Sequence, residues 1–200
     1  GGPYSMVISD SNDTITLTNV MIGELWVAAG QSNMEISFNS EHADPLDKPT
    51  VDFNDLRFLK VKDNFSSSPV EDIKLTGSWP PEIHRANDSW RPGTAANSED
   101  FSMVAYYFAR NIHQALSGMA VGVIDISRGG ASIKAWASEE SQGGSSGPSI
   151  RYASDSDTNM DHYDLFRGHA YPLLGLSARG IIFYQGETDV WWQSTPYCEW

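Results

Sequence analysis

The 200-residue sequence has a single cysteine, few basic side chains and no long hydrophobic run. Cys198 alone cannot form a disulfide within this sequence or a CxxC metal or redox motif. The 13 Lys and Arg against 26 Asp and Glu give a net charge of −13, which repels phosphate backbones and anionic lipid headgroups. No apolar run approaches the roughly 18 to 20 residues of a membrane span. These absences argue against a disulfide scaffold, a nucleic-acid partner and a membrane partner.

The rest of the composition is that of a folded chain. Apolar side chains make up 40% of the sequence and charged ones 20%, with 17 Gly and 10 Pro, so a disordered or fibrous chain is excluded. This length suits one domain or part of a larger one. Residues 1–4 lack the basic and apolar segments of a signal peptide. We therefore expect that a signal was removed or that the chain begins inside a longer protein.

Hydrophobic patterning predicts alternating strands and helices. Residues 14–20 alternate apolar and polar with a period of two, which is typical of a half-exposed strand. Ser98 is expected to cap a helix with an apolar stripe from Phe101 to Leu116, and Gly118 to end it. Apolar strands are expected at residues 21–29, 56–61, 120–126 and 181–184, with 70–75 as a weaker candidate, and shorter helices at 133–136 and 165–176. This order indicates an α/β fold, with a parallel sheet covered by helices on both faces.

Three polar, Gly-marked segments follow the expected strands, at residues 30–34, 127–130 and 185–187. Ligands of parallel sheets bind at the carboxyl ends of the strands, so the three segments are expected to meet. A Ser32 hydroxyl, a backbone N–H near Gly130 and the Gln185 amide are the groups that attack on an ester carbonyl needs, since charge develops on its oxygen.

Each segment also has a structural interpretation. A serine after a glycine is more often a cap or turn residue, paired glycines are usually a turn, and a Gln-Gly-Glu strand end usually carries solvated side chains. None of the segments follows the G-x-S-x-G, P-loop or G-x-G-x-x-G pattern. The functional interpretation therefore depends on the three segments taken together.

The joint pattern resembles a known family. Residues 30–34 (GQSNM), 129–136 (GGASIKAW) and 184–187 (YQGE) look like the three N-terminal blocks of the sialate O-acetylesterase family, within the SGNH hydrolases. The resemblance covers nearly the whole chain and implies a three-layer α/β/α sandwich with a parallel, flavodoxin-like sheet. It implies that residues 1–20 are the end of a preceding β segment. Residues 21–200 would be the N-terminal part of the esterase domain, incomplete at the C-terminus.

The resemblance also implies roles for individual residues. Ser32 would be the nucleophile, and its backbone N–H, that of Gly130 and the Gln185 amide would form the oxyanion hole. Arg128 stands where these esterases often carry Trp, Phe183 also replaces a Trp, and Asp189 replaces a common Asn. The expected substrate-binding residues are Gln31, Asn33, Arg128, Glu187 and Trp191. For Trp191 a core role, and for Glu187 a role in fixing its loop, are the alternatives. No cofactor and no metal are implied.

The general base is missing from the sequence. The family supplies an Asp or Glu and a His three residues later, and this spacing does not occur at any of the five histidines, which are His42, His84, His113, His162 and His169. A serine hydroxyl is a weak nucleophile without a base. We expect the Asp and His to lie beyond Trp200. The acidic residues Asp155, Asp157, Asp161 and Asp164 lack EF-hand spacing, which favours a solvated loop over a cation site.

The function that follows is hydrolysis of O-acetyl groups on carbohydrates, O-acetylated sialic acids first, through an acetyl-serine intermediate. The alternatives are an acetylxylan-type esterase, a lipase-like esterase of the same fold and a carbohydrate-binding pseudoenzyme. The expected partner is a glycan or small-molecule acetyl ester; oligomeric state is left open. Sequons at Asn12, Asn64 and Asn87 fit a secreted glycoprotein. The expected location is secreted or lysosomal, or periplasmic if the protein is bacterial.

Overall fold

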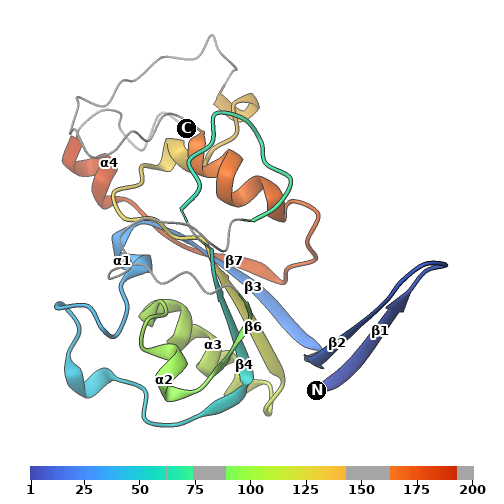
Figure 1. Ribbon diagram of the computed structural model, residues 1–200. Helices are drawn as coiled ribbons and strands as arrows, with labels where there is room; N and C mark the ends of the chain where they lie inside the picture. The colour runs from blue at the N-terminus through green and yellow to red at the C-terminus, as the bar shows by residue number, and fades with distance from the viewer. Residues whose placement is uncertain (62, 74–88, 143–162, 193–200) are drawn as a thin grey trace.

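The computed structural model describes residues 1–61, 63–73, 89–142 and 163–192, and its centre is a five-stranded sheet (Figure 1). The strand order is β5-β4-β6-β3-β7. The four strands β4, β6, β3 and β7 run parallel, whereas β5 pairs antiparallel with β4. The strands are β3 (Gly23–Gly30), β4 (Phe53–Lys60), β5 (Arg91–Gly93), β6 (Ala120–Asp125) and β7 (Gly180–Tyr184). The predicted parallel sheet is confirmed.

Helices and helical turns cover both faces of this sheet, as predicted. Along β6, Val123 packs into a core with α3 (Met103–Ala115), while its neighbour Ile124 packs into a second core on the other face. The second core is closed by η5 (Phe166–Ala170), a π-helical turn, and by the 3-10 turn η6 (Tyr171–Leu173), which contribute Ala170 and Leu173. Since successive side chains of a strand point to opposite faces, continuous apolar strands were the signal for this three-layer arrangement.

A separate hairpin precedes the sheet. Strands β1 (Tyr4–Ser9) and β2 (Thr14–Val20) form a two-stranded antiparallel sheet that projects away from the main sheet (Figure 1). The period-two pattern at residues 14–20 thus predicted a strand correctly. Apart from Val20, every side chain of this hairpin is exposed.

Two details of the sequence-based prediction are wrong. The cap of α3 is Ser102 rather than Ser98, because the Ser102 Oγ accepts the Ala105 N–H at 3.1 Å. Ser98 instead ends a short preceding helix, α2 (Ala95–Ser98). Residues 70–73 form no strand, and residues 74 and 75 lie outside the described part. The remaining elements are α1 (Ser32–Glu35), α4 (Glu187–Trp192) and the 3-10 turns η1 (Pro45–Asp47), η2 (Ile133–Trp136) and η3 (Glu140–Gln142).

Candidate active site

The three polar segments meet at the carboxyl ends of β3, β6 and β7. Strand β3 lies between β6 and β7, so the segment after β3 is flanked by the other two. We call residues 127–133, which follow β6, the glycine loop. A Cβ atom built on Gly129 would lie 3.8 Å from the Ser32 Cβ, so the glycine loop lies against the serine. On the other side, Gly30 has a φ of +139° and a Cβ there would lie 2.0 Å from the Tyr184 carbonyl oxygen. Only glycine permits this approach of β3 and β7 directly before the serine.

Ser32 presents its hydroxyl to solvent. It is the first residue of α1 and its side chain is exposed. Within the described ranges its Oγ has no hydrogen-bond partner, although its carbonyl accepts the Ile36 N–H at 2.9 Å. An exposed hydroxyl where three loops converge is free to meet a substrate.

The Gln31 side chain joins the first loop to the third. It is only 3% exposed, and its Oε1 accepts the N–H groups of Gly186 at 3.1 Å and Thr188 at 3.0 Å. The same oxygen lies 3.3 Å from the Gln185 Nε2. Gln31 was predicted to bind substrate, but this burial leaves it little surface for one. Its contacts are those of a residue that fixes the loop after β7.

The Gln185 amide is held by three acceptors. Its Nε2 lies 3.3 Å from Gln31 Oε1 and 3.2 Å from the Ala131 carbonyl oxygen, and it also donates to Asp189 Oδ2. An amide nitrogen carries two hydrogens, so these acceptors share them. The amide is therefore fixed beside the glycine loop, and its role as an oxyanion donor stays a prediction.

Two buried carboxylates support the glycine loop, and the sequence interpretation missed both roles. Glu35 is 9% exposed and its Oε2 accepts the Gly129 N–H at 2.6 Å. Asp189 is 5% exposed and its Oδ2 accepts the Ile133 N–H at 3.0 Å. Glu35 follows the serine by one helical turn and carries no motif of its own. Asp189 stood out only as a departure from the family pattern.

A third buried carboxylate lies beneath the start of the same loop. Asp125 Oδ1 accepts the Ser127 N–H at 2.9 Å and its hydroxyl at 2.5 Å. Lys60 Nζ lies 3.7 Å from Asp125 Oδ2, and both side chains are buried. Burial raises the pKa of Asp125, and the nearby Lys60 charge opposes this effect. The network fixes residue 127, from which the glycine loop begins.

Of the other residues predicted to bind substrate, Asn33 and Glu187 contact each other. The Asn33 Nδ2 donates to Glu187 Oε1, which joins the loops after β3 and β7. Glu187 Oε2 is buried and has no hydrogen-bond partner in the described part of the chain. The alternative that Glu187 fixes its loop is thus consistent with the geometry. Trp191 lies in α4, but its side chain falls outside the described residues.

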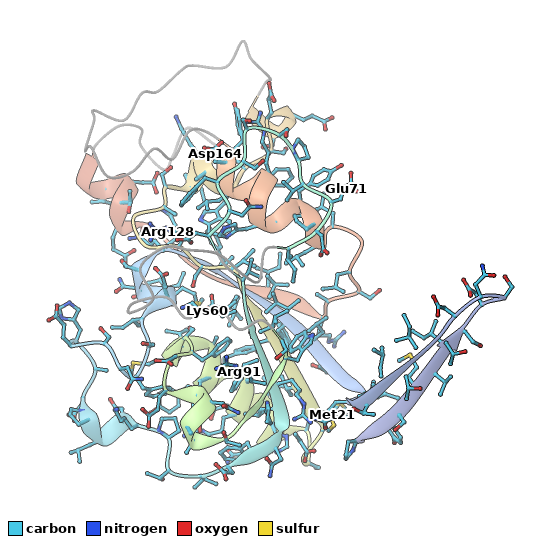
Figure 2. The ribbon with its side chains drawn as sticks, viewed as in Figure 1. Met21, Lys60, Glu71, Arg91, Arg128 and Asp164 are labelled. Carbon is cyan, nitrogen blue, oxygen red and sulfur yellow. The ribbon has the colours of Figure 1, made fainter. Side chains whose placement is uncertain are left out.

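Arg128 contacts the segment after β4. Its Nε lies 3.3 Å from Asp63 Oδ2, and its guanidinium carbon lies 5.6 Å from the centre of the Phe65 ring. Arg128 and Lys60 are both labelled in Figure 2, near the carboxyl ends of β6 and β4. The arginine therefore adds a charged group beside the glycine loop, and whether it contacts substrate stays a prediction.

None of the three histidines that the structure describes is hydrogen-bonded to Ser32. His169 is fully buried, its Nδ1 lies 3.0 Å from the Ile126 carbonyl oxygen and its Nε2 accepts the Asn64 N–H at 2.9 Å. Both ring nitrogens are therefore occupied in the neutral Nδ1–H tautomer, and burial lowers the pKa of this imidazole. His113 Nδ1 contacts the Met119 carbonyl oxygen at 2.8 Å, at the opposite end of β6 from the site. His42 is exposed beside Glu41, at 3.7 Å.

His84 and His162 lie outside the described residues, as do Asp155, Asp157 and Asp161 of the acidic segment. Asp164 is described and buried, so the expectation of a solvated residue is wrong at this position. The described ranges contain no group of three or more His, Cys, Asp or Glu that could hold a metal ion. They also contain no helix of the length and apolar character needed to cross a membrane.

Known proteins similar to this chain are carbohydrate acetylesterases. Sialate O-acetylesterases from Homo sapiens and Pongo abelii are 26% and 25% identical to it over 98% of this chain. The crystal structure of a carbohydrate acetylesterase from Xanthomonas citri superposes with a TM-score of 0.76, at 28% identity over 94% of this chain. The chain spans 38% of the length of each of these proteins.

A family model described as carbohydrate esterase, sialic acid-specific acetylesterase, matches residues 22–197. The match includes all three loops that meet at Ser32, and it includes Glu35 and Asp189. From this match, and from the α/β architecture it shares with the bacterial esterase, the chain belongs to the sialic acid-specific acetylesterase family of carbohydrate esterases.

Proposed function

We propose that this chain carries the nucleophile and oxyanion hole of a serine esterase that removes O-acetyl groups from carbohydrates. The preferred substrates in this proposal are O-acetylated sialic acids. The observation that supports it best is the exposed Ser32 hydroxyl, which has no hydrogen-bond partner among the described residues and lies next to Gly129 of the loop that also contacts the Gln185 amide. In this proposal residues 21–200 form the N-terminal part of the esterase domain, and residues 1–20 end a preceding β segment.

In the proposed mechanism the Ser32 Oγ attacks the acetyl carbonyl carbon while its proton passes to a general base. The negative charge moves to the carbonyl oxygen, where the N–H groups of Ser32 and Gly130 and the Gln185 amide donate hydrogen bonds. The bond from the acetyl carbon to the sugar oxygen then breaks, and the sugar oxygen takes the proton from the base. Water hydrolyses the acetyl-serine and releases acetate.

The general base is proposed to lie outside the residues that the structure describes. Of the three described histidines, His169 has both ring nitrogens occupied, His113 lies at the opposite end of β6, and exposed His42 contacts Glu41. We continue to expect an Asp-x-x-His pair beyond residue 200. A secretory location is also part of the proposal, and exposed Asn12 in the β1–β2 turn is one sequon that a glycosyltransferase could reach.

The test is hydrolysis of O-acetylated sialic acid and of acetylated xylo-oligosaccharide by the full-length protein and by its Ser32→Ala variant. We expect release of acetate, faster from the sialic acid, and its loss in Ser32→Ala by a factor on the order of ten thousand or more at unchanged Tm. Ser5→Ala, at an exposed serine of β1, serves as the matched control and keeps full activity. Activity retained in Ser32→Ala would contradict the nucleophile assignment. Faster release of acetate from the xylo-oligosaccharide would contradict the preference for sialic acid.

A further inference from the structure

Glu35 and Asp189 hold the glycine loop at two points, on either side of its centre. The Gly129 N–H donates to Glu35 Oε2 at 2.6 Å, and the Ile133 N–H donates to Asp189 Oδ2 at 3.0 Å. Both acceptors are carboxylates on buried side chains. Hydrogen bonds to ionised acceptors are shorter and stronger than those between neutral groups. The loop is therefore fixed at residues 129 and 133 by charge-assisted bonds.

Between these two points lies Gly130, whose backbone is exposed. Its φ is +74°, in the left-handed region that favours glycine, and its N–H has no acceptor among the described residues. The N–H before it and one after it are thus bound to protein, while this one remains available to a ligand. A loop held on both sides with a free donor between them is suited to bind developing negative charge.

We propose that Glu35 and Asp189 are positioning residues, which set the Gly130 N–H and the Gln185 amide for the oxyanion of the esterase reaction. This inference rests on the proposed function and adds to it two residues that touch neither substrate nor the reacting atoms. Burial of a carboxylate away from water costs free energy unless its oxygens accept hydrogen bonds. Here those bonds go to the loop itself, so the charge and the loop conformation stabilise each other.

Glu35 sets the distance between the loop and the nucleophile. Ser32 and Glu35 lie three residues apart on α1, one helical turn, so their relative positions are fixed by the helix. A Cβ built on Gly129 would lie 2.9 Å from Glu35 Oε2 and 3.8 Å from the Ser32 Cβ. The same helix thus carries the nucleophile and the carboxylate that holds the oxyanion loop against it.

Asp189 links two oxyanion donors from different loops. Its Oδ2 accepts both the Ile133 N–H and the Gln185 Nε2. The glycine loop follows β6 and Gln185 follows β7, which are separated by β3 in the sheet. One carboxylate oxygen therefore fixes the backbone donor and the side-chain donor relative to each other.

The experiment compares Glu35→Ala, Glu35→Gln, Asp189→Ala and Asp189→Asn in the full-length protein, with Glu41→Ala as the control at an acid that is 88% exposed. Gln and Asn keep an acceptor oxygen at the same place. We expect kcat to fall by about tenfold to a hundredfold in the alanine variants, somewhat less than for loss of a direct donor, with KM within about twofold. The amide variants keep the acceptor but lose its charge, so their kcat should fall less than that of the matching alanine variants, whereas Glu41→Ala should stay within about threefold of the wild type.

Amide hydrogen exchange of the peptide that covers residues 128–133 gives a second readout, which does not need activity. Exchange should quicken in both alanine variants, remain near the wild type in the amide variants, and be unchanged elsewhere at equal Tm. Unchanged kcat or unchanged exchange in the alanine variants would overturn the inference, as would a fall in kcat that is as large in the amide variants as in the alanine variants. A wild-type protein without esterase activity would instead contradict the proposed function and with it the catalytic part of the inference, and the exchange data would then show whether Glu35 and Asp189 hold the loop.

Discussion

The aromatic core beneath α3 and the loop cluster at the sheet edge are built by different forces. We define the aromatic core as Phe38, Phe58, Phe101 and Tyr106, and the loop cluster as residues 30–35, 127–133 and 185–189. In the core, the rings of Phe58 and Phe101 stack with centroids 4.3 Å apart and are at most 1% exposed. Burial of apolar surface, which has no direction, stabilises this region.

The loop cluster also buries the apolar residues Met34 and Ala131, but several of its buried side chains are polar and are fixed by directional hydrogen bonds. Gln31 and Asp189 are 3% and 5% exposed, and both accept backbone N–H groups of other loops. Polar groups are costly to bury and need these specific partners. The difference suggests that the core determines how stable the fold is, whereas the loop cluster determines what it can catalyse.

The largest expected effect is that of a substitution in the aromatic core, which tests whether the core and the loop cluster act independently. Phe58→Ala removes a fully buried ring and should lower the free energy of unfolding by about 3–5 kcal/mol, because the transfer free energy is lost and a cavity remains. Denaturant unfolding measures this change. Activity per folded molecule should stay within twofold of the wild type. A fall in kcat that exceeds the loss of folded protein would show that the two regions are coupled.

The next effect concerns the loop cluster. Gln185→Ala should lower kcat by about a hundredfold to a thousandfold, because a donor to the oxyanion is removed, with little change in Tm. Steady-state kinetics on an acetylated sugar measures it. Gln114→Ala, at an exposed glutamine of α3, is the control and should leave kcat unchanged. If the rate is unchanged in Gln185→Ala, this side chain has a structural role only.

The smallest expected effect concerns His169, a buried polar residue that takes no part in the proposed chemistry. Burial lowers the pKa of His169 in the folded state, so the unfolded chain binds a proton more readily. The free energy of unfolding should therefore fall as the pH drops below about 6.5, the ordinary pKa of histidine.

His169→Gln should flatten this pH dependence between pH 7 and 5, as measured by denaturant unfolding at each pH. His42→Gln, at a histidine whose side chain is 76% exposed, is the control for the substitution itself. The raised pKa of Asp125 acts in the opposite direction but is common to all three proteins, so it cancels in the comparison. An equal slope in His169→Gln and the wild type would show that His169 does not titrate on unfolding.

The sequence predicted what depends on periodicity and chain order. The apolar stripe that ends near Leu116 predicted α3, and the apolar runs predicted β3, β4, β6 and β7, although most of β7 is exposed. The convergence of the three segments followed from the rule for parallel sheets. The resemblance in the three blocks identified the family, and the family match over residues 22–197 confirms it.

What the sequence did not predict depends on contacts between distant residues. Ser98 and Ser102 both precede the apolar stripe, and the choice between them is made by the Met34 carbonyl oxygen, which accepts the Ser102 hydroxyl at 2.5 Å. The Glu35 contact joins residues 94 apart in the sequence. Strand β5 has three residues, one of them Pro92, which is too short for a periodic signal.

The most direct test of the account is intact-mass measurement of the full-length protein, quenched in acid within milliseconds of mixing with a small acetyl ester. We predict a mass increase of one acetyl group, located at Ser32 by peptide mapping and absent in Ser32→Ala. Acetate release without a labelled Ser32, or an acetyl group on another residue while Ser32→Ala stays active, would contradict the assignment of Ser32 as the nucleophile.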